Sequence, residues 1–180
     1  RIDWGYFYMA ADKENSSCAT GEGKTLRKSF IDGKLTSSKT DGSDKLALVR
    51  SLGETKKAEG HLLLGYDDLY SIQYFGENLR PYWNRNGNET IQSQFAKADK
   101  EYDAVMDKCA AFDANLMKEA TEVGGRKYAE LCALAYRQAI AAHKLVEAPN
   151  KDLLFLSKEN FSNGSIGTVD ITYPSAPLFL

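Results

Sequence analysis

Two acidic residues, Glu159 and Asp170, lie in a polar segment near the C-terminal end that is rich in asparagine, glycine and serine. Carboxylates can act as general acids and bases, and loops held by a rigid scaffold often carry catalytic groups. Asn160 and Tyr173 in the same segment could orient a small polar substrate. Because long loops within compact domains tend to be functional, we expect a substrate site here. The alternative is that Lys158 and Glu159 form only a solvated charge pair.

A second candidate is the pair of adjacent carboxylates Asp67 and Asp68, which several aromatic residues follow. Either could supply a general acid or bind a polar ligand. Adjacent residues of a strand point to opposite faces, so the two need not act together. The alternative is a turn and helix cap, because aspartate is a preferred residue at helix N-termini.

A third candidate is the run in which Arg80 and Arg85 flank Tyr82 and Trp83. Two guanidinium groups beside aromatic rings could hold a carboxylate through paired hydrogen bonds and stacking. The alternative is a linker whose large aromatic side chains only pack between two domains.

Several other classes of site find no support. The three cysteines have no metal-ligand spacing, and we predict neither a metal nor a cofactor. We expect Cys109 and Cys132 to be buried on apolar helix faces. His61 and His143 have no serine in a nucleophile-elbow setting near them, and we expect His143 to be a hydrogen-bonded core residue. The formal charge of −2 and the lack of a long apolar run predict binding to neither nucleic acid nor membrane.

The elements that must position these groups change in character near residue 90. The first part alternates apolar and polar residues or is rich in aromatic side chains, which is typical of strands. The expected strands cover residues 2–10, 26–31, 46–52 and 60–66. We interpret residues 1–75 as antiparallel strands that close a β-sandwich, followed by a linker over residues 76–90.

The second part, residues 91–180, is predicted to be helical, which makes the fold class α+β. Apolar residues from Phe95 to Leu116 recur at alternating spacings of three and four, as on one face of a helix. Gly124 and Gly125 are expected to end that helix. The next helix, over residues 127–146, is apolar on nearly every face and is therefore expected to be buried. One such αα-hairpin cannot bury it alone, so we interpret it as part of an (α/α) toroid. This incomplete core and the apolar ends lead us to expect an internal segment of a larger protein.

The same segments resemble the glutaminase A family. The resemblance is carried by the runs IDWGY (2–6), YDDLYSIQYF (66–75), RPYWNR (80–85), AYRQ (135–138), KENFSNG (158–164) and GTVDITYPSAP (167–177). It extends from one end of the chain to the other. It implies the middle piece of a large secreted protein, with a β-sandwich before an (α/α)6 toroid as in six-hairpin glycosidases. Family sequences often have cysteine where this chain has Ser165, so no thiol nucleophile is expected there.

The resemblance implies that the intact protein hydrolyses L-glutamine to glutamate and ammonia, although this segment alone is expected to be inactive. Our hypothesis gives the acid and base roles to Glu159 and Asp170, and carboxylate pairing to Arg80 or Arg137. Two alternatives stay open, a glycoside hydrolase on the same architecture and a non-catalytic module that binds sugar or peptide. The partners expected are a small substrate and the remaining domains of the parent chain, in a secreted or periplasmic location.

Overall fold

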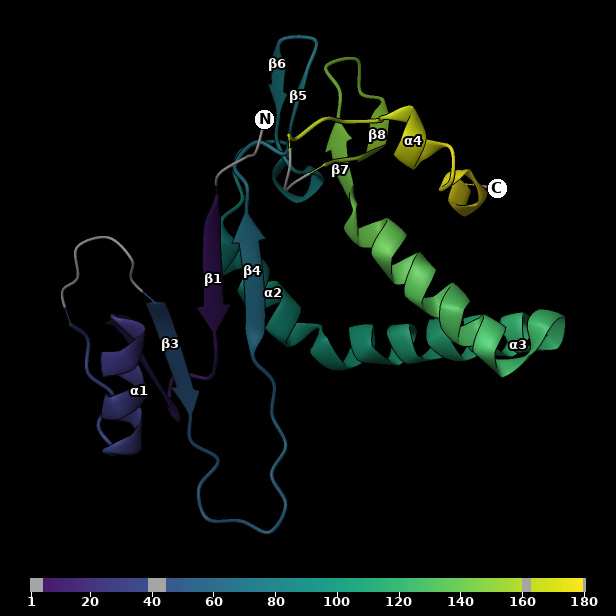
Figure 1. Ribbon diagram of the computed structural model, residues 1–180. Coiled ribbons are helices and arrows are strands. Elements are labelled where there is room, and N and C mark those ends of the chain that lie inside the picture. The colour runs from purple at the N-terminus through teal and green to yellow at the C-terminus, as the bar shows by residue number, and fades with distance from the viewer. Residues whose placement is uncertain (1–4, 39–44, 160–162, 180) are drawn as a thin grey trace. The chain divides into compact units, whose positions relative to one another are not determined.

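The computed structural model describes residues 5–38, 45–159 and 163–179 (Figure 1). The chain divides into two units. The smaller unit is Phe7–Gly65, and the larger unit combines Arg1–Tyr6 with Tyr66–Leu180.

In the smaller unit, one helix packs against an antiparallel strand pair. Strand β2 (Ser16–Gly21) pairs with β3 (Lys45–Arg50), in a register that places Cys18 opposite Leu48. Helix α1 (Gly23–Ile31) contacts both strands. Its one buried residue is Leu26, at 4% exposure.

The strand predicted over residues 26–31 is wrong, because these residues belong to α1. The Glu22 carboxylate accepts hydrogen bonds from the backbone amides of Lys24 and Thr25, at 3.2 and 3.0 Å. These bonds satisfy amides that a helix start leaves without partners, and they favour a helix over a strand.

The other strand predictions are partly confirmed. The segment predicted over residues 2–10 contains β1 (Tyr6–Ala10), and the one over residues 60–66 overlaps β4 (Leu63–Asp67). These two strands pair with each other, and β3 lies in the segment predicted over residues 46–52. Strand β2 was not predicted, and neither were the strands of the larger unit that are described next. The described strands form two-stranded sheets, and closure of a β-sandwich stays a prediction.

The core of the larger unit lies where two hairpins meet. One hairpin is β5 (Ile72–Tyr74) with β6 (Glu77–Leu79), and the other is β7 (His143–Glu147) with β8 (Leu153–Ser157). The buried cluster consists of Ile72, Leu79 and Val146, with Tyr74, Leu154, Leu156 and Ile166 packed against it. The two hairpins are far apart in sequence, so this apolar cluster holds together the segments that carry the polar groups described below.

The predicted αα-hairpin is confirmed. Helix α2 (Ile91–Lys100) precedes a long helical segment, α3 (Tyr102–Ala141), which changes direction sharply at Gly125 (Figure 1). Gly125 has φ 79° and ψ 174°, a conformation that is essentially restricted to glycine. The parts of α3 before and after Gly125 form the two arms of the hairpin. The arms contact each other at Phe112 and Tyr136, whose ring centroids are 5.2 Å apart. The glycine pair therefore forms the bend of the hairpin, as predicted.

Three details of the helix predictions are wrong. The second arm ends at Ala141, because His143–Glu147 leaves the helix to pair with β8. Its apolar side chains are also largely exposed in this structure, among them Leu131 at 63% and Leu134 at 50%. Cys109 is exposed and Cys132 is half-buried, so the expected burial of Cys109 is wrong as well.

Short elements complete the larger unit. They are η1 (Tyr82–Asn84), which follows β6, and α4 (Val169–Thr172) and η2 (Ala176–Phe179) near the C-terminal end. In the described part of the chain, no helix combines the length and apolarity needed to cross a bilayer.

Candidate functional site

An open hollow of about 420 Å³ lies within the larger unit. Its walls come from the turn after β4, from η1 and from the start of β7. The lining residues combine aromatic rings, a carboxylate, an ammonium, a hydroxyl and an imidazole: Tyr66, Asp68, Ser71, Pro81, Tyr82, Trp83, His143, Lys144 and Leu145. A concave site with apolar walls and a few convergent polar groups is the usual form of a small-molecule site.

The turn after β4 places one carboxylate inside the hollow. The Asp67 side chain accepts a hydrogen bond from the backbone amide of Leu69 at 2.9 Å, and Leu69 has a positive φ of 58°. A short polar side chain that bonds its own backbone two residues later stabilises such turns. Asp67 therefore stabilises the turn, whereas its neighbour Asp68 is buried at 7% exposure and lines the hollow. The turn of the alternative interpretation is confirmed, but strand β5 follows it, so the helix cap is wrong.

The Asp68 carboxylate has a partner on each oxygen. The Nζ of Lys144 lies 3.1 Å from its Oδ2, and the Ser71 hydroxyl donates to its Oδ1 at 3.0 Å. A buried carboxylate needs such partners, because taking a charge out of water is costly. Lys144 keeps 28% side-chain exposure, so its ammonium can pair with Asp68 and still meet a ligand.

His143 lies next to Lys144 at the start of β7 and is buried at 8% exposure. Its Nδ1 donates to the carbonyl of Ala139 at 2.5 Å. Its ring stacks on the ring of Phe155, with the two ring centroids 4.7 Å apart. The expectation of a hydrogen-bonded core histidine is confirmed. In the neutral tautomer that donates from Nδ1, Nε2 is a hydrogen-bond acceptor.

Lys158, at the end of β8, connects two walls of the hollow. It is buried at 7% exposure, and its side-chain ammonium donates to the backbone carbonyl of Ser71. Burial lowers the pKa of this ammonium below its ordinary value. The solvated charge pair with Glu159 considered above is therefore wrong.

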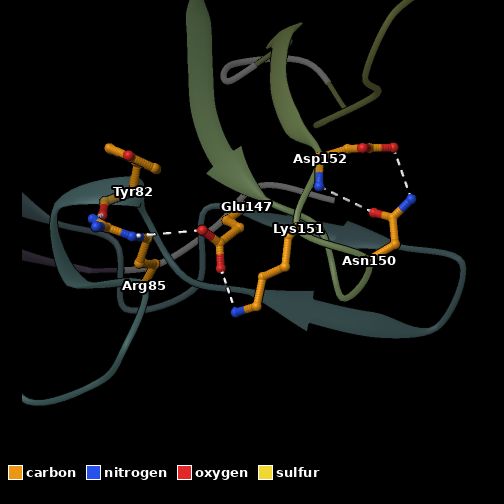
Figure 2. Close-up of polar contacts among 6 residues, drawn as sticks. All are labelled: Tyr82, Arg85, Glu147, Asn150, Lys151 and Asp152. Atoms are coloured by element: carbon orange, nitrogen blue, oxygen red, sulfur yellow. Dashed lines mark hydrogen bonds and ion pairs between the residues drawn. The ribbon is translucent and has the colours of Figure 1, made fainter.

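A cluster of charges fixes η1 against β7 (Figure 2). The Arg85 guanidinium lies over the Tyr82 ring, 4.1 Å from its centroid, and donates to the Tyr82 carbonyl at 3.0 Å. The Glu147 carboxylate, on β7, lies 3.6 Å from Arg85 Nε and 2.7 Å from Lys151 Nζ. Because Tyr82 and Trp83 line the hollow, the contacts of Arg85 with Tyr82 and Glu147 position its aromatic wall, whereas Lys151 pairs with Glu147 within its own hairpin.

Asp68 is the predicted site residue that lines this hollow. The guanidinium of Arg80 lies 5.0 Å from the centroid of the Tyr70 ring, and Arg137 is exposed on α3. Neither lines the hollow, and their roles stay predictions.

The predicted acid and base lie in the C-terminal segment, outside the lining of the hollow. Glu159 is half-buried, and its backbone amide donates to the Ser165 carbonyl at 2.9 Å. Asp170 is in the first turn of α4 and is exposed, and Tyr173 is 80% exposed. Asn160 lies outside the described residues. The catalytic assignment of Glu159 and Asp170 stays a prediction.

Sequence reasoning did not assign site roles to Lys144, Ser71 or Lys158. The site role of Lys144 was not predicted because its segment was interpreted as the end of an apolar helix. A signal was present after it, since Pro149 and Asn150 mark a turn between two short apolar runs. Across the described residues, no three histidine, cysteine or acidic side chains gather as a metal site would require.

Comparison with known proteins identifies relatives for both parts of the chain. A family model described as a domain of unknown function (DUF5127) matches residues 1–119. A second model, the glutaminase A six helical-hairpin domain, matches residues 125–180 and so begins at the glycine of the bend. No solved structure matches the chain.

Two curated relatives carry glutaminase names. The chain is 28% identical to Glutaminase A of Aspergillus oryzae over 194 residues, a match that covers 100% of this chain and 28% of that protein. It is 36% identical over 69 residues to a protein of Arthroderma benhamiae named a probable glutaminase, covering 38% of this chain and 8% of that protein. The chain thus spans less than a third of the first relative's length.

Proposed function

Since this chain belongs to the glutaminase A family, we propose that it is part of a longer hydrolase that converts L-glutamine and water to L-glutamate and ammonia. The observation that carries this proposal is the match to Glutaminase A over the whole of this chain. The hollow of the larger unit supports it, because its groups are complementary to an amino acid.

A free amino acid presents a carboxylate and an ammonium on the same carbon. The Lys144 ammonium is placed to pair with the first, and the Asp68 carboxylate can accept from the second. Charge-assisted hydrogen bonds of this kind are about twice as strong as neutral ones. The rings of Tyr66 and Trp83 would cover the methylene groups of the side chain and exclude water. A volume of about 420 Å³ is sufficient for a ligand of this size.

Amide hydrolysis also needs an acid and a base. A carboxylate base takes a proton from water as its oxygen attacks the amide carbon, and an acid donates a proton to the departing ammonia. We assign these two roles to Glu159 and Asp170, with Asn160 and Tyr173 orienting the amide and Arg80 or Arg137 as a further carboxylate partner. Glu159 follows Lys158, whose ammonium reaches the Ser71 carbonyl at the wall of the hollow.

A glycan is the second candidate substrate. The observation that favours it is the aromatic wall, because Tyr66, Tyr82 and Trp83 all line the hollow and sugar rings stack on such surfaces. On this reading, a buried carboxylate such as Asp68 would bond to sugar hydroxyls. A binding module without catalysis would use the same wall.

The test is turnover by the full-length protein that carries this chain. L-Glutamine should release ammonia and glutamate in equal amounts, and a panel of oligosaccharides should yield no new reducing ends. Glu159→Gln and Asp170→Asn should each lower kcat strongly. Unchanged turnover in both variants would remove these two roles, and hydrolysis of a glycan but not of glutamine would select the second candidate.

The family resemblance also motivates the proposal that the parent protein is secreted. Its presence in the culture medium, measured against a cytoplasmic marker, tests this. Retention of the protein inside the cells with the marker would contradict it.

A further inference from the structure

Lys158 makes hydrogen bonds to two segments next to residues that line the hollow. Its backbone amide donates to the carbonyl of Ala142 at 2.9 Å, directly before the residues His143 and Lys144 that line the hollow. Its side-chain ammonium donates to the carbonyl of Ser71, which is 87 residues away in the sequence. The two bonds tie the start of β7 to the turn that follows β4.

The bond to Ser71 bears directly on the buried carboxylate. The Ser71 hydroxyl donates to Oδ1 of Asp68 at 3.0 Å, and Oδ2 of Asp68 lies 3.1 Å from Lys144. A series of contacts therefore leads from Lys158 through Ser71 and Asp68 to Lys144. Movement of Ser71 would change the direction in which Asp68 presents its second oxygen.

A lysine at such a buried position costs free energy, because its ammonium is removed from water. The residue is 7% exposed, and burial lowers the pKa of its ammonium. A methionine of similar length would fill the space without removing a charge from water. Groups with pKa values shifted by burial are concentrated at functional sites, because their chemistry there outweighs the cost.

We propose that Lys158 is a positioning residue that holds Ser71 and the start of β7 so that the Asp68 carboxylate and the Lys144 ammonium are presented together to the substrate. The geometry of the four residues carries the proposal. The identity of the substrate, an amino acid, rests on the function proposed above.

The first arm of the test needs no enzymatic activity. The full-length protein and its Lys158→Met variant are reductively methylated under limiting reagent, and the rate at Lys144 is read by peptide mass spectrometry. The contact with Asp68 holds the Lys144 amine and restricts the approach of the reagent, so loss of the bond from Lys158 to Ser71 should speed its modification several-fold. The matched control is Lys151→Met, which removes a 77% exposed lysine of the same hairpin and should leave the rate at Lys144 unchanged. An unchanged rate at Lys144 in Lys158→Met overturns the proposal.

The second arm separates positioning from stability. Lys158→Met should raise the KM for L-glutamine about tenfold and change kcat less than about threefold, since the groups it positions bind the substrate. A purely structural defect would lower the amount of active enzyme, and so the apparent kcat, at unchanged KM. That result would overturn the proposal, whereas Lys151→Met should match the unmodified protein in both constants.

A second variant keeps the test decisive if Lys158→Met does not fold. Ser71→Ala removes the hydroxyl that holds Asp68 and should speed methylation of Lys144 in the same direction. An unchanged rate there would break the series of contacts and overturn the proposal. Faster methylation without any glutamine turnover in the unmodified protein would support the positioning role and reject the proposed function. Glutamine turnover by the unmodified protein, with an unchanged methylation rate at Lys144 and an unchanged KM in Lys158→Met, would support the proposed function and reject the positioning role.

Discussion

The ammonium of Lys144 lies 3.1 Å from the carboxylate of Asp68, within the larger unit. This contact joins the start of β7 to the turn after β4, which are segments that the sequence analysis assigned to different regions of the chain. The two side chains differ in burial, at 28% exposure for Lys144 and 7% for Asp68. That difference gives the pair an asymmetric response to substitution.

Lys144→Met should destabilise the strands around the hollow more than Asp68→Asn does. The first change leaves a buried carboxylate without its cation, whereas the second leaves an ammonium that can turn to water. Loss of one partner of a fully buried pair costs about 3–5 kcal/mol, and the partial exposure of Lys144 reduces this to about 2 kcal/mol. Asp68→Asn should cost about 1 kcal/mol, because the amide oxygen can still accept from Ser71.

The measurement is hydrogen exchange by mass spectrometry on peptides that cover β5, β6, β7 and β8 in the full-length protein, because exchange reports local opening. Lys151→Met serves as the control and should change these peptides little. A larger effect from Asp68→Asn than from Lys144→Met would contradict the burial assigned to the pair.

Gly125→Ala should loosen the αα-hairpin. At φ 79° and ψ 174°, an L-residue with a side chain is strained by about 1–3 kcal/mol. The exposed Val123, two residues earlier, offers a control, since Val123→Ala should change stability by less than about 0.5 kcal/mol. Exchange of the amides in both arms of α3 measures the effect. Equal protection in the two variants would show that the bend does not require glycine.

The start of α1 should depend on acid through Glu22. Hydrogen bonds from the side chain and the backbone amide of Thr25 lower the pKa of the Glu22 carboxyl from its ordinary value of 4.5. A carboxyl whose pKa is lowered on folding stabilises the folded state above the ordinary value. This contribution is lost as the pH falls through the lower, folded-state value.

The amides of Lys24 and Thr25 report on this cap, because both donate to the Glu22 carboxylate. Their protection, corrected for intrinsic exchange rates, should decrease on acidification below pH 4.5 in the unmodified protein. Glu22→Gln should show lower protection at neutral pH and little further change in acid. The same pH dependence in both proteins would contradict the cap.

The elements with long and regular patterns were predictable from the sequence. The alternation of apolar residues from Phe95 to Leu116 predicted a helix, and Gly124 and Gly125 marked its bend. These signals are local, because helix periodicity and glycine conformation depend on neighbouring residues. The strand predicted at residues 26–31 was wrong because a short apolar segment fits both a strand and a helix. The capping carboxylate of Glu22 was the signal that could have decided it.

The candidate site was less predictable because distant pairings assemble it. Asp68 was identified from its chemistry, whereas Lys144 was assigned to a helix that in fact ends at Ala141. The pairing of β7 with β8, and the packing of Val146 against Ile72, bring these residues together. Such contacts leave no periodic trace in one sequence. Burial of Lys158 could not be inferred either, since lysine is ordinarily exposed.

The most direct test of the proposed function is the KM for L-glutamine of the full-length protein, compared between Lys144→Met and Lys151→Met. Loss of one charge-assisted bond to the substrate carboxylate should raise KM about tenfold or more in Lys144→Met, because such a bond contributes about 1.5–3 kcal/mol. Lys151→Met, which alters a lysine outside the hollow, should remain within about twofold of the unmodified protein. An unchanged KM in Lys144→Met, in a protein that hydrolyses glutamine, would contradict the assignment of the hollow as the amino-acid site.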